Sequence, residues 1–162
     1  MCDPVTLAIT AAVVTAGGQI HAGQAANAQG KYQQRVAEQN AVMEERSRAD
    51  AIVRGETDQL RHYRRVAQSL GEARVRNSAA GLDVSFGSAS NLENDIALMG
   101  YEDSGTLAEN TRREVMGYDM NAINQRTQGK AARMQGKAAQ TAGYIGAAGT
   151  ILSTASQVAK KP

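Results

Sequence analysis

A chain of 162 residues is long enough for one domain, but its composition excludes an ordinary globular core. Trp is absent, Phe occurs once and Tyr five times, whereas alanine and glycine are abundant, so few large side chains can fill an interior. The formal net charge of +2 is too small by itself to indicate nucleic-acid binding, and a single cysteine, Cys2, excludes an intrachain disulfide. These features favour thin layers of closely packed helices.

Proline, the residue that most often ends helices, occurs only at positions 4 and 162. We therefore expect an all-α fold, an extended antiparallel helical hairpin with apolar, small-residue terminal helices. Because a monomer would expose both apolar ends, we also expect the hairpin to be oligomeric.

Residues 1–30 predict an apolar, Ala/Gly-rich N-terminal helix with Asp3 and Pro4 at its N-cap and first position. Three residues on one face of this helix are candidates for contact with a membrane or a partner: Val5, Ile9 and Val13.

The N-terminal helix has two features that limit it. Its apolar run, residues 4–16, is shorter than the roughly 20 residues that a membrane-spanning helix needs, so we expect a soluble protein. The adjacent Gly17 and Gly18 should kink or interrupt the helix, because each costs about 1 kcal/mol relative to alanine.

Residues 31–80 predict a long polar helix that buries one narrow seam, as in a coiled coil. The apolar stripe that defines this seam consists of Val36, Met43, Ile52, Val53, Leu60, Tyr63, Ala67 and Leu70.

The densest basic patch of the chain lies within this helix, at Arg61, Arg64 and Arg65 beside His62. These arginines are candidates for phosphate contact, although a solvated helix face explains them equally well.

Residues 81–90 predict the hairpin loop. Gly81 suits the left-handed residue that ends a helix, and Gly87 relieves the next turn of a Cβ clash. Ser90 and Glu93 have the spacing of a capping box, which places the start of the second helix at Ser90.

Residues 90–142 predict the second long helix, with a bend or break near 100–106 where Gly100 and Gly105 weaken it. Charge changes along this half of the chain. Residues 83–119 hold eight acidic and two basic side chains, whereas residues from 120 onward hold six basic and none acidic.

A seven-residue repeat, QGKAARM followed by QGKAAQT, places a glycine stripe on the second helix. Such a stripe indicates close backbone approach by another helix. In the hairpin, residue 30 falls opposite roughly residue 140, which brings two glycine stripes together. The candidate helix-packing residues are Gly23, Gly30, Gly129, Gly136 and Gly143.

Residues 143–162 predict an apolar C-terminal segment followed by a basic tail. Its candidates for membrane or partner contact are Ile145, Ile151 and Leu152. Its length is borderline for spanning a bilayer and its Ser, Thr and Gln lower its hydropathy, so we expect packing within an assembly rather than insertion.

Catalytic and cofactor-binding patterns are missing from the sequence. His21 and His62 lack neighbours at metal-ligand spacing and are predicted to be ordinary surface histidines. The glycine-lysine pairs of the repeat lack the ending of a phosphate loop. We therefore expect no enzyme activity, no cofactor and no metal.

Three features together resemble the small internal virion proteins, also called core or ejection proteins, of short-tailed phages. They are the opening Met1-Cys2-Asp3-Pro4-Val5, the tip pattern Gly81-x-x-x-Ser85-x-Gly87-Ser88, and an Ala/Gln/Arg-rich helix that ends in a Gly-rich apolar tail. The resemblance covers nearly the whole chain.

The resemblance implies a protein packed inside the capsid near the portal, which is released at infection and helps to form a conduit through the host envelope for the genome. Its partners would be copies of itself in a ring-like homo-oligomer, portal or other core and tail proteins, and the host outer membrane, with DNA contact non-specific at most. A portal- or tail-bound adaptor that stays in the particle, and a nucleic-acid-associated helical protein, are the alternatives.

Overall fold

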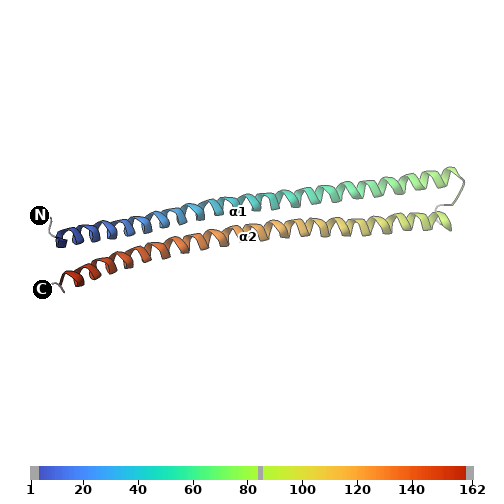
Figure 1. Cartoon of the computed structure of the whole chain (residues 1–162). Helices are drawn as coiled ribbons and strands as arrows, with labels where there is room; N and C mark the ends of the chain where they lie inside the picture. Colours follow the sequence, from blue (N-terminus) through green and yellow to red (C-terminus); the bar gives the residue numbers. More distant parts are fainter. Residues whose placement is uncertain (1–3, 84–85, 160–162) are drawn as a thin grey trace. The chain divides into compact units, whose positions relative to one another are not determined.

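The computed structural model describes residues 4–83 and 86–159, apart from the side chains of Pro4, Val5, Ala8 and Val158. Two α-helices make up almost all of this part of the chain (Figure 1): α1, Pro4–Ala79, and α2, Ser88–Ala159. The predicted all-α helical hairpin is confirmed. The predicted N-cap Asp3, Ser85 of the tip pattern and the tail lysines 160 and 161 lie outside the described residues.

Both helices are continuous. The helix α1 passes through Gly17 and Gly18, and α2 passes through residues 100–106, so neither the interruption at the first site nor the break at the second occurs. A kink or bend at these glycines stays a prediction. A glycine lowers helix stability by only about 1 kcal/mol, which packing along a long helix readily offsets. The changes of composition near residues 30 and 142 likewise coincide with no break in either helix.

The end of α1 is a Schellman motif. Gly81 has a φ of 73°, in the left-handed region that was predicted for it. Its N–H donates to the Ser78 carbonyl at 3.0 Å, and the Leu82 N–H donates to the Asn77 carbonyl at 3.0 Å. These bonds satisfy carbonyl groups that the end of the helix would otherwise leave without partners.

The start of α2 differs from the prediction. Gly87, with a φ of 74°, occupies the N-cap, and its carbonyl accepts the first helical bond from the Asn91 N–H at 3.1 Å. Ser90 therefore lies inside the helix, and the predicted capping box does not form. Glu93 instead accepts a hydrogen bond from Arg74 Nε of α1 at 2.9 Å. Both groups of this bond are charged, which makes it stronger than a bond from a neutral backbone amide.

The contacts divide the chain into two compact units. Unit 1 comprises residues 1–42 and 122–162, and unit 2 comprises residues 43–121. In each unit a segment of α1 packs antiparallel against a segment of α2.

The seam between the helices is built from small residues. Among the described residues, no large side chain is fully buried, and every buried apolar residue is an alanine: Ala12, Ala16, Ala37, Ala41, Ala51, Ala73, Ala89, Ala122 and Ala147. The predicted seam of larger side chains is therefore correct only in part, because Val36, Ile52 and Leu70 are half-buried and its other members are exposed. Leu60 and Tyr63, for example, are 58% and 54% exposed.

Glycines bring the two backbones closest together in unit 1. A Cβ added to Gly30 would lie 2.6 Å from the Ala132 carbonyl oxygen and 3.3 Å from the Gly136 Cα. A Cβ on Gly143 would lie 2.6 Å from the Gln19 carbonyl oxygen. Residue 30 thus lies opposite residues 132–136 rather than 140, because the centre of the loop falls slightly before residue 85.

The buried and half-buried positions of α2 in unit 1 recur every seven residues. A seven-residue period favours a left-handed supercoil, because it is shorter than two ideal turns of α-helix. One heptad position contains Ala122, Gly129, Gly136 and Gly143, and the other contains Arg126, Arg133, Gln140 and Ala147.

Unit 2 follows a different period, eleven residues. An eleven-residue repeat corresponds to 3.67 residues per turn and favours the opposite, right-handed supercoil. On α1 the repeating positions include Ala51, His62 and Ala73, with Gly55, Val66 and Asn77; on α2 they include Glu93, Ser104 and Val115, with Ile96, Leu107 and Tyr118.

Replacing Gly81 with alanine should lower the free energy of unfolding by about 1–2 kcal/mol, because the left-handed conformation places Cβ too close to the following carbonyl. Gly71→Ala is the matched control. Gly71 lies within α1 and an added Cβ would meet nothing within 4 Å, so this change should stabilise the protein by about 0.5–1 kcal/mol. Urea denaturation followed by circular dichroism measures both, and equal effects of the two variants would contradict the assignment.

Gly30→Ala should destabilise unit 1 by about 1–3 kcal/mol, because the methyl group would collide with the Ala132 backbone and force the helices apart. Gly18→Ala provides the comparison, since a Cβ there would meet nothing within 4 Å. The two variants gain the same helix propensity, so the difference between their denaturation midpoints isolates the packing cost. A Gly30→Ala protein as stable as Gly18→Ala would show that the backbones are not in close contact.

Candidate functional site

The strongest candidate site is an apolar groove in unit 1, between the first turns of α1 and the last turns of α2. It has a volume of about 400 Å³, and we call it the terminal groove. It is lined by Ile9, Ala12, Val13, Ile151, Thr154, Ala155 and Ala159.

Exposed apolar side chains surround the terminal groove. Leu152 is 70% exposed, Ile145 is 69% exposed and Val13 is 62% exposed. Because two helices packed through alanine and glycine leave little room between them, these larger side chains face outward. The same end of unit 1 also exposes Leu7, Ile9, Val14, Tyr144 and Ile151.

The structure describes the side chains of five of the six predicted contact residues, and these five divide into two groups. The structure brings Ile9, Val13 and Ile151 together in the terminal groove. Ile145 and Leu152 are exposed on α2 and do not line it. Val5 belongs to α1, but its side chain lies outside the described residues.

Within the residues that the structure describes, neither helix contains a stretch apolar enough over sufficient length to cross a membrane.

Polar side chains link the two helices across the seam of unit 1. Asn27 Nδ2 donates to Gln140 Oε1 at 2.5 Å, and Asn27 Oδ1 accepts a hydrogen bond from Arg133. Nearer the terminal groove, Gln19 and Thr150 form a weaker contact at 3.5 Å. These pairs, together with the glycine contacts, fix the register in which α1 meets α2.

One flank of unit 1 is strongly basic. On α2, four basic residues at spacings of four and three residues form a single ridge: Arg126, Lys130, Arg133 and Lys137. On α1, the facing ridge consists of Asn27, Lys31, Arg35 and Glu38. Two cross-links join the ridges on the same flank, Arg126 to Glu38 at 3.2 Å and Arg133 to Asn27. We call the six cations of this flank the basic strip.

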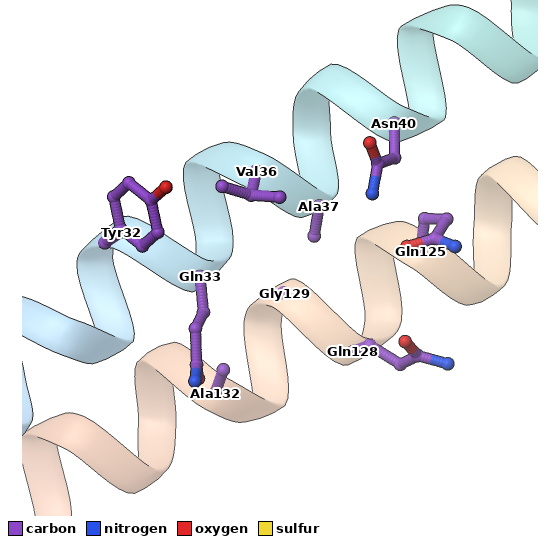
Figure 2. A pocket seen from close by; sticks show the side chains of 9 residues that line it. All are labelled: Tyr32, Gln33, Val36, Ala37, Asn40, Gln125, Gln128, Gly129 and Ala132. Atoms are coloured by element: carbon purple, nitrogen blue, oxygen red, sulfur yellow. The ribbon is translucent and has the colours of Figure 1, made fainter.

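On the other flank of unit 1, the residues that the structure describes carry no charge. A groove of about 300 Å³ lies there between Tyr32 and Val36 of α1 and Gln125 and Gln128 of α2 (Figure 2). The methyl group of Ala37 points toward Gly129 at its base. Unit 1 therefore has two chemically different sides.

The predicted phosphate-contact residues lie in unit 2. Arg61, Arg64 and Arg65 line a shallow hollow with Leu107, and Asp58 lies in the same hollow. Arg61 Nη1 pairs with Asp58 Oδ1 at 3.4 Å, which partly neutralises the cluster. Their contact with phosphate stays a prediction.

A further charge cluster in unit 2 is satisfied within α2. Hydrogen bonds from Arg112 and then Arg113 hold the pKa of the Glu109 carboxyl below its ordinary value, and the Glu109 carboxylate raises the pKa of Arg112. Nε of each arginine lies 2.9 Å from a carboxylate oxygen of Glu109.

His62 is buried, which corrects its prediction as a surface histidine. Its Nε2 lies 2.8 Å from the Gly100 carbonyl oxygen, and the neighbouring Tyr63 hydroxyl lies 2.9 Å from Ser104 Oγ. A Cβ added to Gly100 would lie 2.7 Å from Val66 Cγ2, so glycine at this position makes room for the Val66 side chain of α1. Among the described residues, no group of His, Cys, Asp and Glu is arranged to hold a metal ion.

Sequence reasoning identified the excess of basic residues after position 120 but missed Lys31 and Arg35 alongside them, and it missed the polar contacts of His62. Each of these arises from pairs of residues far apart in the chain. The signals that could have found them are the four-three spacing of the cations after residue 120 and the eleven-residue recurrence of small residues around His62.

No curated protein and no solved structure matches the chain. A family model does match it, over residues 1–161, and that model describes the T7 virus internal virion protein gp14 family. The match extends over both helices and the loop between them. The chain therefore belongs to the T7 virus internal virion protein gp14 family.

Proposed function

We propose that this protein packs as an oligomeric core near the portal inside the capsid, and that after release it helps to form a conduit through the host envelope for the genome. Family membership supports the coarser part of this role, a structural protein within the virion that associates with other virion components. The family is not a known class of enzyme. The position near the portal, the ring-like oligomer and the conduit are the proposed parts.

The observation that carries the proposal is the terminal groove with its exposed apolar surroundings. Exposed apolar surface of this extent marks a site of contact with protein or lipid. In the particle, neighbouring copies or other core proteins would cover it. After release, the same side chains would be available to the host outer membrane.

The architecture of each unit suits such a change of surroundings. A pair of helices that meet along a narrow seam has almost no interior, so little of its stability comes from a core of its own. Most of its large apolar side chains are therefore available for contacts between molecules, including Met43, Val53, Leu60, Leu98 and Met116. Neighbours in a ring would stabilise the pair by covering them.

The membrane step is tested by flotation of the full chain with phosphatidylcholine vesicles, whose zero net charge excludes attraction by the basic strip. Val13→Asp combined with Ile151→Asp should reduce the fraction bound at least about tenfold, because charged groups replace two apolar side chains in the terminal groove. The matched control is Leu98→Asp with Met116→Asp, which changes two similarly exposed residues of unit 2 and should leave flotation unchanged. Equal flotation of both variants would contradict lipid contact by the terminal groove.

The release step has its own test. Quantitative mass spectrometry of purified virions, before and after genome release is triggered, should show that most copies of the protein leave the particle. A large structural protein of the capsid shell serves as the internal standard. Full retention would instead support a portal- or tail-bound adaptor.

A further inference from the structure

We propose that the basic strip of unit 1 binds the phosphate backbone of duplex DNA without reading its sequence. This inference is independent of the lipid contact proposed for the terminal groove.

The charge of unit 1 is concentrated in the strip. Among its described residues, unit 1 has six basic side chains and one acidic side chain, Glu38. Glu38 is paired with Arg126. The other cations include four exposed ones that have no partner among the described residues: Lys31, Arg35, Lys130 and Lys137.

The cations of the strip are spaced closely enough for several of them to contact neighbouring phosphates of one duplex. The α2 ridge extends from Arg126 to Lys137, which corresponds to roughly 16 Å of helix at 1.5 Å per residue. Lys31 and Arg35 lie alongside it, because the residues that flank them on α1, Asn27 and Glu38, contact Arg133 and Arg126. Six cations in this distance correspond to one per roughly 2.7 Å, compared with about one phosphate per 1.7 Å of duplex axis.

The composition of the ridges favours a nucleic acid over a membrane surface. Beside the α2 ridge only Ile123 and Met134 expose large apolar side chains, whereas basic helices that bind membranes need a broad apolar face to enter the interface. Long, flexible lysines and arginines on a regular ridge suit phosphate contact, which positions DNA but carries no sequence information.

The arginines of unit 2 are a weaker candidate for the same partner. Asp58 shares the hollow with Arg61, Arg64 and Arg65. Among the described residues, unit 2 also has fourteen acidic side chains against ten basic ones. The local field there opposes a polyanion, whereas the field of unit 1 attracts it.

The test is fluorescence anisotropy of a labelled 30-base-pair duplex titrated with the full chain at several salt concentrations. The wild type should show a slope of log affinity against log salt of about −4, and two unrelated sequences should bind equally. A variant with Lys31→Gln, Arg35→Gln, Lys130→Gln and Lys137→Gln should lose nearly all of this slope. Glutamine has a helix propensity close to that of lysine and arginine, and circular dichroism verifies that the helices are intact.

The matched control changes Arg61, Arg64 and Arg65 to glutamine and should retain the wild-type slope to within about one unit. A second variant, Lys130→Arg with Lys137→Arg, should bind as the wild type does, because charge is what the phosphates attract. Four results would each overturn the proposal: no salt-dependent binding by the wild type, an unchanged slope in the strip variant, loss of binding confined to the unit 2 control, or a strip variant that loses binding to phosphatidylglycerol vesicles but not to DNA.

Discussion

The close approach of two helix backbones through alanine and glycine is the constraint on which the rest of this protein depends. At Gly30 and Gly143 there is no room for even one methyl group, and the buried apolar side chains described elsewhere in the seam are all alanines. A buried methyl-sized group contributes about 0.8 kcal/mol, against about 1.5–3 kcal/mol for a leucine side chain. Each pair of turns is therefore stabilised weakly, and many turns must act together. The same constraint directs large apolar side chains outward, where only another molecule can cover them.

The buried and half-buried positions of the seam recur with a different period in each unit. Unit 1 repeats every seven residues and unit 2 every eleven, so the seam tends to wind left-handed in the first and right-handed in the second. In each unit, polar side chains at some of the repeating positions make contacts across the seam. Asn27 contacts Gln140 and Arg133 in unit 1, whereas His62 reaches the Gly100 carbonyl in unit 2. Since an alanine seam discriminates poorly between neighbouring registers, these directional contacts specify which residues lie opposite one another.

Much of the fold could be predicted from the sequence, because its signals are local. The absence of internal proline, the left-handed glycine at the end of α1 and the glycine repeat of α2 each act within a few residues. The seam of α1 could not be predicted from hydrophobicity. Leucine and tyrosine at positions 60 and 63 form a regular apolar pattern yet are more than half exposed, because the buried face is chosen by size. Glu93 shows the same limit: its local spacing indicates a capping box, but Arg74 of the facing helix binds it.

Because this protein has so thin an interior, nearly all of its chemically distinct side chains lie on its surface. In unit 1 the seam separates a flank of uncharged side chains from a flank of cations, and the open end of the pair is apolar. An amphipathic helix in a globular domain has one outward face, whereas a two-helix pair has several. These faces can differ in composition, because none of them has to pack against a core. A structural protein of the virion associates with other virion components through its surface. One pair of helices offers three chemically distinct surfaces without a larger fold.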